Sequence, residues 1–404
     1  MPTKIGTSKA ARRPKKRKVS PTTSSSRSSQ LSAKAPARKP RSKLTKKRSK
    51  APQRVAAKAL ALDPFAALLT SVKPDIDARL AGFLDAKMDE IRPHGPRVQE
   101  MLREARDLCL RGGKRLRPAL VIAGFQSAQP RADWDAALDA GVAIELLHAY
   151  FLIHDDWMDQ DATRRGAPSV HTSLSARYRS VHIGSSSAIL AGDYIAALAT
   201  EALSRVDIAA ARMPRVFTCF ARMQADAVAG QQLDLLGTSD AERTYRLKTG
   251  SYTVRGPLVL GALLAGAKPS VIEALERYSL PVGVAFQMRD DLLSAFGDPK
   301  DTGKPFANDI RSGKRTALVA HTLRRAKASD KKAFSAAFGN AKATKKQLVR
   351  AVHILESSGA RAAVERRIQT LVNETLAEIS QSKLPPATRQ MLTGAAHLLT
   401  ERRR

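Results

Sequence analysis

The most informative segment of the sequence runs from His148 to His171 and reads HAYFLIHDDWMDQDATRRGAPSVH. Leading into it, apolar residues recur at three- and four-residue spacing, at Leu138, Val142, Leu146, Ala149 and Ile153. This period is that of a helix with one apolar face, and the pattern continues up to the first pair of acids. Runs that alternate with the two-residue period of a strand are scarce in the rest of the chain. The sequence therefore predicts an all-α body.

Composition narrows the class of protein. The chain has 404 residues, 43% of them hydrophobic, which is enough for a substantial core. Its two cysteines, Cys109 and Cys219, cannot support a disulfide-rich scaffold. The absence of CxxC and HExxH motifs disfavours a structural zinc site or a zincin. No run of 18 apolar residues and no apolar leader occur, so we expect neither a spanning helix nor a secretory signal.

The positive charge is concentrated at the N-terminus. The formal net charge is +32, and residues 1–60 carry 20 Lys and Arg without a single Asp or Glu. This segment is rich in Ser and Pro, so we predict a disordered tail followed by one helical domain over 61–404. Three interpretations of the tail stay open. It is a solvated arm, an anchor to nucleic acid or to an anionic membrane, or a targeting segment. Pro14–Val19 is similar to a nuclear-import signal and leaves nuclear or organellar targeting open, although we expect a cytoplasmic protein.

Two acidic pairs suggest a metal site. Asp155 and Asp159 are four residues apart, so they share one helix face about one turn, ~5.4 Å, from each other. Carboxylates at this spacing suit Mg²⁺, which commonly shares its ligands with substrate phosphates. A solvated acidic helix end is the alternative. In a second stretch, polar groups recur on one face at Asp290, Ser294 and Asp298. Two such helices facing each other would allow Mg²⁺ to bridge them to a diphosphate.

Basic groups accompany the acids. Lys114 and Arg117 follow Gly112-Gly113, where glycine lets the backbone approach an anion. His148 lies two turns before Asp155, although alone it would more often be a core histidine. Further candidates are Arg164, Arg165, Lys248, Thr249, Lys304 and Lys314. Each of these signals is weak by itself, because the chain is basic throughout.

Together and in this order, the motifs resemble those of the trans-isoprenyl diphosphate synthases, the polyprenyl synthetase family. The matching strings are GGKRLRP, HDDWMDQDATRRGAPSVH, KTG, FQMRDD and GKPFANDIRSGKRT, which span about residues 100–320. The resemblance implies an isoprenoid synthase type I helical bundle around a central cavity, as a homodimer. It also implies a transferase that joins isopentenyl diphosphate to an allylic diphosphate.

The resemblance assigns roles to the site residues. It implies that Mg²⁺, as three ions with substrate bound, is held by Asp155, Asp156, Asp159, Asp290 and Asp291. The cations around the allylic diphosphate would be Arg164, Lys248 and Lys304. Those around isopentenyl diphosphate would be Lys114, Arg117, His148 and Arg165. Thr249 and Gln287 would line the cavity near the allylic cation, and the departing diphosphate would accept the proton.

One departure keeps alternatives open. Ser294 stands where the second family motif often has a third Asp, and Asp290-Asp291 with Ser294 and Asp298 approximates the metal triad of class I terpene cyclases. Cyclases bind no isopentenyl diphosphate, so the retained GGKRLRP and RRG favour chain elongation. A second alternative is a non-catalytic binding protein that uses the basic tail.

Product length is predicted from two aromatic residues. Phe151 and Tyr150 lie four and five residues before Asp155, about 6–8 Å back along the helix axis. In the family, bulky residues here accompany short products, because they block the path of the growing chain. We therefore expect an all-trans C15 or C20 prenyl diphosphate, unless one ring only packs in the core.

Overall fold

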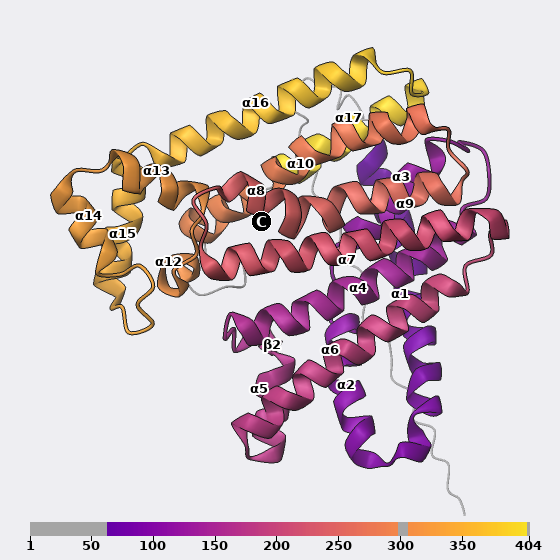
Figure 1. Ribbon diagram of the computed structural model, residues 1–404, viewed down its shortest axis with the longest axis horizontal. Coiled ribbons are helices and arrows are strands. Elements are labelled where there is room, and N and C mark those ends of the chain that lie inside the picture. Colours follow the sequence, from indigo (N-terminus) through magenta and orange to yellow (C-terminus); the bar gives the residue numbers. More distant parts are fainter. Residues whose placement is uncertain (1–62, 298–305, 402–404) are drawn as a thin grey trace, which may run out of the picture. The chain divides into compact units, whose positions relative to one another are not determined.

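The computed structural model describes residues 63–297 and 306–401. The whole of the tail predicted over 1–60, together with Asp298 and Lys304, therefore lies outside the described residues. The described part consists of helices joined by short connections, with one two-stranded antiparallel pair, β1–β2 (Figure 1). The predicted all-α class is confirmed.

The elements follow one another along the chain without an internal repeat. They are α1 (Pro64–Glu90), η1 (Arg92–His94), α2 (Pro96–Leu110), α3 (Leu116–Gln126), α4 (Asp135–Met158), β1 (Thr163–Arg164), β2 (Ala167–Pro168), α5 (Val170–Tyr178), α6 (Val181–Ser204), η2 (Ala210–Arg212), α7 (Met213–Leu236), α8 (Ala241–Tyr245), η3 (Arg246–Arg255), α9 (Gly256–Leu264), α10 (Pro269–Phe296), α12 (Asn308–Ser312), α13 (Ala317–Arg325), α14 (Ala328–Ser335), α15 (Lys345–Ser357), α16 (Ala360–Gln381) and α17 (Pro386–Thr400).

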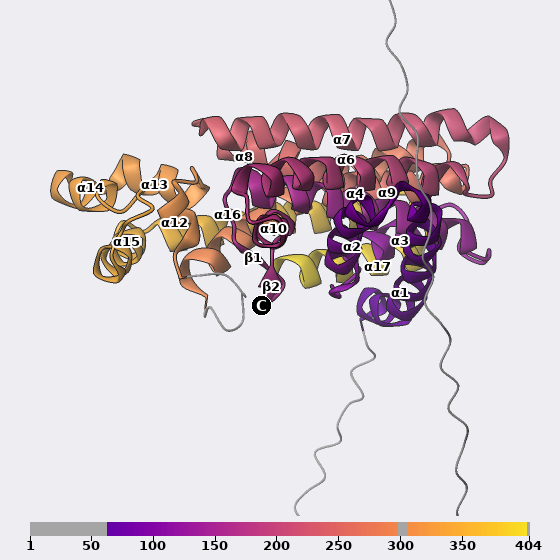
Figure 2. The ribbon, with the colours of Figure 1, turned by 90° about the horizontal axis from the view of Figure 1, so that it is seen from below.

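Helix α4 lies at the centre of the arrangement. Figure 2 shows α6 and α7 along one side, α4 and α10 in the middle, and α1 and α17 on the opposite side. All five residues of the predicted apolar stripe, from Leu138 to Ile153, are buried. The helix ends at Met158, two residues after Asp156. Carboxylates in the last turn of a helix oppose its dipole, so they require cations from neighbouring elements.

Two apolar clusters form the core. The larger one joins α1–α7, α9, the first half of α10 and α17. The smaller one joins the second half of α10 to α8 and α12–α16, around the fully buried Phe334. Helix α10 contributes to both clusters, and it carries the second acidic motif, Asp290-Asp291.

A π-helix, η3, interrupts the α-helical pattern between α8 and α9 and carries Lys248 and Thr249. Such segments are rare and frequently occur at functional sites. Its Gly250 packs directly on Gly283 of α10, where a Cβ atom would come within 2.5 Å of the Gly250 Cα atom. This close approach brings the side chains of η3 next to those one turn further along α10.

Among the described residues, only α4 is long and apolar enough to cross a membrane. Most of it is buried inside the helical body, and it ends in acidic residues, so its apolar length is explained by its place in the core.

Candidate active site

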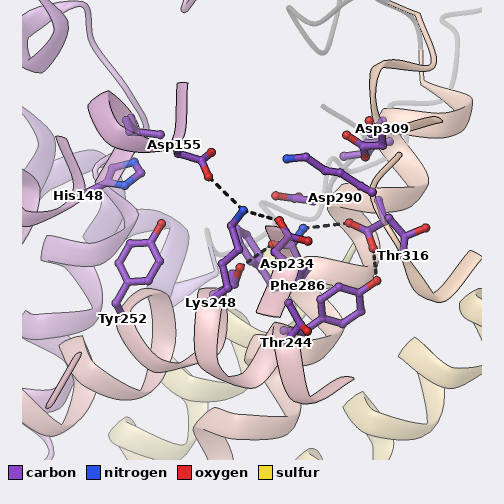
Figure 3. Close-up of a pocket in the computed structure, with 18 of the residues that line it drawn as sticks. His148, Asp155, Asp234, Thr244, Lys248, Tyr252, Phe286, Asp290, Asp309 and Thr316 are labelled. Atoms are coloured by element: carbon purple, nitrogen blue, oxygen red, sulfur yellow. Dashed lines mark hydrogen bonds and ion pairs between the residues drawn. The ribbon is translucent and has the colours of Figure 1, made fainter. Parts of the chain in front are cut away.

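A cavity of about 510 Å³ opens where α4, α7, η3 and α10 meet the connection between α12 and α13 (Figure 3). Its lining includes ten of the residues predicted for the site: Arg117, His148, Asp155, Arg164, Arg165, Lys248, Thr249, Gln287 and both Asp290 and Asp291 of the second motif. Segments more than 150 residues apart in sequence thus meet around one space.

The first acidic wall is paired with two lysines. Lys248 Nζ lies 3.0 Å from Asp155 Oδ1 and 2.6 Å from Asp234 Oδ2 (Figure 3). Lys314 Nζ lies 2.5 Å from Asp159 Oδ2. The predicted sharing of one face by Asp155 and Asp159 is confirmed, because Asp159 caps α4 in a right-handed helical conformation.

These contacts set the protonation of the two carboxylates. Burial alone would raise the pKa of Asp155, but the charges of Lys248 and Lys314 outweigh it and lower this pKa. Burial and the charge of Asp155 raise the pKa of Asp159. Asp155 is therefore the more acidic member of the pair and remains an anion at neutral pH.

Asp156 points elsewhere. Its side chain is 1% exposed and accepts hydrogen bonds from Arg164, with Nε at 2.7 Å. Arg164 is presented by the β1–β2 hairpin, whose two turn residues, Arg165 and Gly166, both have positive φ values of 52° and 75°. Such a turn favours glycine, which explains the Arg-Arg-Gly sequence. In this geometry Asp156 orients Arg164, and its predicted role as a metal ligand stays a prediction.

The second wall is a chain of hydrogen bonds. Asp291, 4% exposed, accepts from Gln287 Nε2 at 2.9 Å and from the Tyr245 hydroxyl. The Thr249 hydroxyl donates to Gln287 Oε1 at 2.6 Å. Asp290 and Ser294 line the cavity on the same helix. Burial and the charge of Asp309 raise the pKa of Asp291 to about 7.

The end of the cavity near α3 is cationic. Arg117 lies 4.6 Å from the ring centroid of Tyr252 and donates to Thr253 Oγ1 at 2.8 Å, and its Nε is buried without a hydrogen-bond partner in the described part of the chain. His148 Nδ1 is also buried there and unpartnered. Burial and the charges of Arg117 and Arg165 lower the pKa of His148, which is therefore neutral. Lys114 is exposed and does not line the cavity.

A smaller apolar pocket of about 200 Å³ adjoins the same residues. Tyr150 and Phe151 both line it, with ring centroids 4.9 Å apart. Phe151 also packs edge-on against Tyr252 at 4.7 Å. Asp155, Lys248 and Tyr252 line both spaces, so the aromatic cluster lies where the pocket meets the main cavity.

Several cavity residues were not assigned a role from the sequence. Asp234 meets Lys248 because Gly230, one turn earlier on α7, packs on the Lys248 backbone, where a Cβ atom would lie 2.1 Å from its nitrogen. Lys314 was noted only as one basic residue among many, yet its partner Asp159 is 155 positions away. The other residues in this group are Asp309, Arg315, Thr316, Tyr245 and Tyr252.

The donor set suits a metal that is shared with a substrate. Within residues 63–297 and 306–401, no three His, Cys, Asp or Glu side chains group closely enough to hold an ion by themselves. Asp155 and Asp290 instead line one cavity from different helices, with cations between them. Mg²⁺ bound through one or two carboxylates, with phosphate oxygens and water completing its shell, fits this arrangement.

Comparison with known proteins identifies the class. Residues 98–355 match the polyprenyl synthetase family. The chain is 34% identical over 281 residues to geranylgeranyl diphosphate synthase of Saccharolobus solfataricus, covering 67% of this chain and 81% of that protein. It is 30% identical over 300 residues to (2E,6E)-farnesyl diphosphate synthase of Mycobacterium bovis, covering 72% and 80%.

A solved structure agrees. Geranylgeranyl pyrophosphate synthase from Corynebacterium glutamicum, in complex with isoprenyl diphosphate and magnesium, superposes with a TM-score of 0.79 and 36% identity, covering 85% of this chain and all of that one. The chain therefore belongs to the polyprenyl synthetase family. It is a prenyltransferase of isoprenoid biosynthesis, and this class is supported over the cyclase and non-catalytic alternatives.

Proposed function

We propose that this enzyme condenses isopentenyl diphosphate with an allylic diphosphate to make an all-trans prenyl diphosphate of 15 or 20 carbons. The observation that carries this proposal is one cavity that is lined by Asp155 of α4 and Asp290 of α10, with Lys248 paired to Asp155 and a separate cationic end at Arg117. One end suits a metal-bound diphosphate, and the other suits a diphosphate bound by cations.

The allylic diphosphate would bind between the acidic walls. Asp155, Asp159 and Asp290 would hold Mg²⁺, while Asp156 and Asp291 would act through Arg164 and Gln287. Lys248 and Lys314 would turn from their carboxylates to the diphosphate oxygens, and Lys304 would join them. Bound Mg²⁺ supplies positive charge that stabilises the leaving diphosphate. That three ions bind with the substrate stays a prediction.

The chain's own groups would then guide the reaction. As the allylic C–O bond breaks, the Thr249 hydroxyl and the Gln287 carbonyl oxygen present negative dipole ends to the developing cation. Arg117, Arg165, His148 and Lys114 would hold isopentenyl diphosphate so that its double bond faces that cation. The new C–C bond forms, and the departed diphosphate accepts the proton that is lost.

The aromatic cluster would limit elongation. A growing chain that starts at the diphosphate next to Asp155 would enter the apolar pocket and meet Tyr150 and Phe151. Relatives of this chain include both a farnesyl and a geranylgeranyl diphosphate synthase. This supports a short product.

A second copy of the chain would cover the outer faces of α6 and α7. Large apolar side chains are exposed there, with Leu190 at 58% and Leu236 at 71%. The others are Val181, Ile183, Val228 and Leu235. Exposed apolar patches of this kind mark protein interfaces, which supports the predicted homodimer.

The test is an incubation with Mg²⁺, labelled isopentenyl diphosphate and dimethylallyl, geranyl or farnesyl diphosphate in separate reactions. Products are dephosphorylated and sized. A linear C15 or C20 alcohol that disappears in Asp155→Ala is expected. A cyclic hydrocarbon made from an allylic diphosphate alone would contradict the proposal, as would the absence of turnover with every primer.

A further inference from the structure

The hydroxyl group of Tyr245 joins three elements of the cavity wall. Tyr245 ends α8 and is 6% exposed. Its hydroxyl donates to Asp291 Oδ2 on α10 and accepts from the backbone N–H of Ala317, the first residue of α13, at 2.8 Å. Both bonds of the hydroxyl are therefore directed to elements that carry site residues.

The Tyr245 hydroxyl holds Asp291, and Asp291 in turn sets the orientation of the Gln287 amide. A carboxylate only accepts hydrogen bonds, so Gln287 must turn its NH₂ group toward Asp291. Its carbonyl oxygen is then left to accept from the Thr249 hydroxyl. A reversed amide would place N–H groups where this oxygen lies, and would present the positive end of its dipole to the allylic cation.

Through Ala317, the same hydroxyl restrains the opposite wall. The first N–H groups of a helix have no partner within that helix, and Tyr245 satisfies the one at the start of α13. The three residues directly before it, Lys314 to Thr316, all line the cavity. Figure 3 shows Thr316 and Asp309 on the side of the cavity opposite His148.

We propose that Tyr245 is a positioning residue for prenyl transfer. It holds Asp291, and with it the Gln287 amide, in the orientation that favours the cation, and it keeps the Lys314–Thr316 segment against the diphosphate. This inference rests on the proposed function. Its consequence is a slower chemical step with unchanged affinity for isopentenyl diphosphate, because Arg117 is held by separate contacts with Tyr252 and Thr253.

The chain offers a matched control. Tyr278 on α10 is fully buried, and its hydroxyl donates to the Leu392 carbonyl at 2.7 Å, in the packing of α10 against α17. Tyr245→Phe and Tyr278→Phe each delete one hydroxyl group from a buried ring. A general loss of stability would affect both variants, whereas a positioning role affects only the first.

The experiment measures kcat, KM for each substrate and the share of primer released as its alcohol, at a pH above the pKa of Asp291. The alcohol forms when the allylic C–O bond breaks and water, not isopentenyl diphosphate, adds to the cation and loses a proton. For Tyr245→Phe we expect kcat to fall about 10- to 100-fold, because Asp291 loses the hydrogen bond that orients it. The KM for isopentenyl diphosphate should stay constant and the alcohol share should rise. Tyr278→Phe should match the wild type.

Two further readouts separate the outcomes. The thermal shift produced by Mg²⁺ with an allylic thiolodiphosphate should persist in Tyr245→Phe. The double variant Tyr245→Phe with Asp291→Asn should have a kcat close to that of the more impaired single variant, because both substitutions act through one carboxylate. If the losses in kcat multiply in the double variant, or if Tyr245→Phe has the same kinetics as Tyr278→Phe, the positioning role of Tyr245 is wrong and the proposed function is unaffected. A wild-type enzyme without turnover would overturn the proposed function and the inference with it.

Discussion

The ammonium group of Lys248 lies 3.0 Å from a carboxylate oxygen of Asp155. It also lies 2.6 Å from Asp234, so one cation joins the first acidic motif on α4 to α7. This pairing keeps the carboxylates of the last turn of α4 compensated when no diphosphate is bound. When a metal-bound diphosphate binds, it would replace these pairings with contacts to groups that are already charged and partly buried.

Lys248→Gln should therefore weaken binding of the allylic substrate. We expect the KM for the allylic diphosphate to rise and kcat/KM to fall by about 10- to 100-fold, because a buried charge contact to the diphosphate is lost. Steady-state kinetics with isopentenyl diphosphate held at saturation measure this effect. Arg246→Gln, at the exposed start of the same π-helix, is the control and should have no effect. Equal kinetics for both variants would argue against the assigned role of Lys248.

Arg117→Gln should affect the other substrate. Its guanidinium group has a buried Nε that meets no hydrogen-bond partner among the described residues. We therefore expect a higher KM for isopentenyl diphosphate, by about tenfold, and little change for the allylic primer. The reverse pattern would show that the two ends of the cavity are assigned the wrong way round.

Stability should depend on pH through Asp291. Its pKa is about 7 in the folded state, against about 3.9 when unfolded, so the folded state holds a proton that the unfolded state releases. The carboxyl group therefore destabilises the fold progressively as pH rises from about 4 to 7, by a few kcal/mol at most. Denaturation without Mg²⁺ should show Asp291→Asn gaining stability relative to the wild type as the pH rises from about 4 to 7. A constant difference between the two proteins would contradict the raised pKa.

The combined variant Tyr150→Ala and Phe151→Ala should lengthen the product. Removing two rings from the apolar pocket opens the path behind Asp155, so chains beyond C20 are expected when products are sized. Phe338→Ala, from an aromatic pair in the smaller core cluster, provides the control and should leave product length unchanged. An unchanged product in the double variant would show that the two rings pack in the core and do not limit product length.

Introducing charged residues on the outer faces of α6 and α7 should dissociate the proposed homodimer. Leu190→Glu with Leu236→Glu places two carboxylates among exposed apolar side chains. Light scattering should then give half the wild-type mass, whereas Val349→Glu, at an exposed valine on α15, should not. A wild-type chain that is already monomeric would exclude the proposed interface.

The sequence predicted the helices and the acidic motifs because their signals are local. The apolar stripe of α4 and the four-residue spacing of Asp155 and Asp159 follow from helix geometry alone. The partners of these acids were not predictable in the same way. Lys314 and Asp159 are far apart in the chain, and only the packing of the smaller core cluster brings them together.

Close backbone contacts explain why the roles of two glycines and the π-helix η3 were not predicted from the sequence. Gly230 and Gly250 lie inside helical segments, where glycine usually weakens a helix, and their role emerges only from the neighbouring chain that touches them. The π-helix carrying Lys248 has no sequence signal that distinguishes it from an α-helix. Its geometry depends on the packing of Gly250 against Gly283 on α10.

We propose that carboxylates of two helices, Asp155 on α4 and Asp290 on α10, hold one metal-bound diphosphate. The most direct measurement is calorimetric binding of an allylic thiolodiphosphate, with and without Mg²⁺, to the wild type, Asp155→Asn and Asp290→Asn. We predict binding that requires Mg²⁺ and weakens at least about tenfold in each variant. Binding that is independent of Mg²⁺, or that is unchanged in Asp290→Asn, would contradict a site shared between α4 and α10.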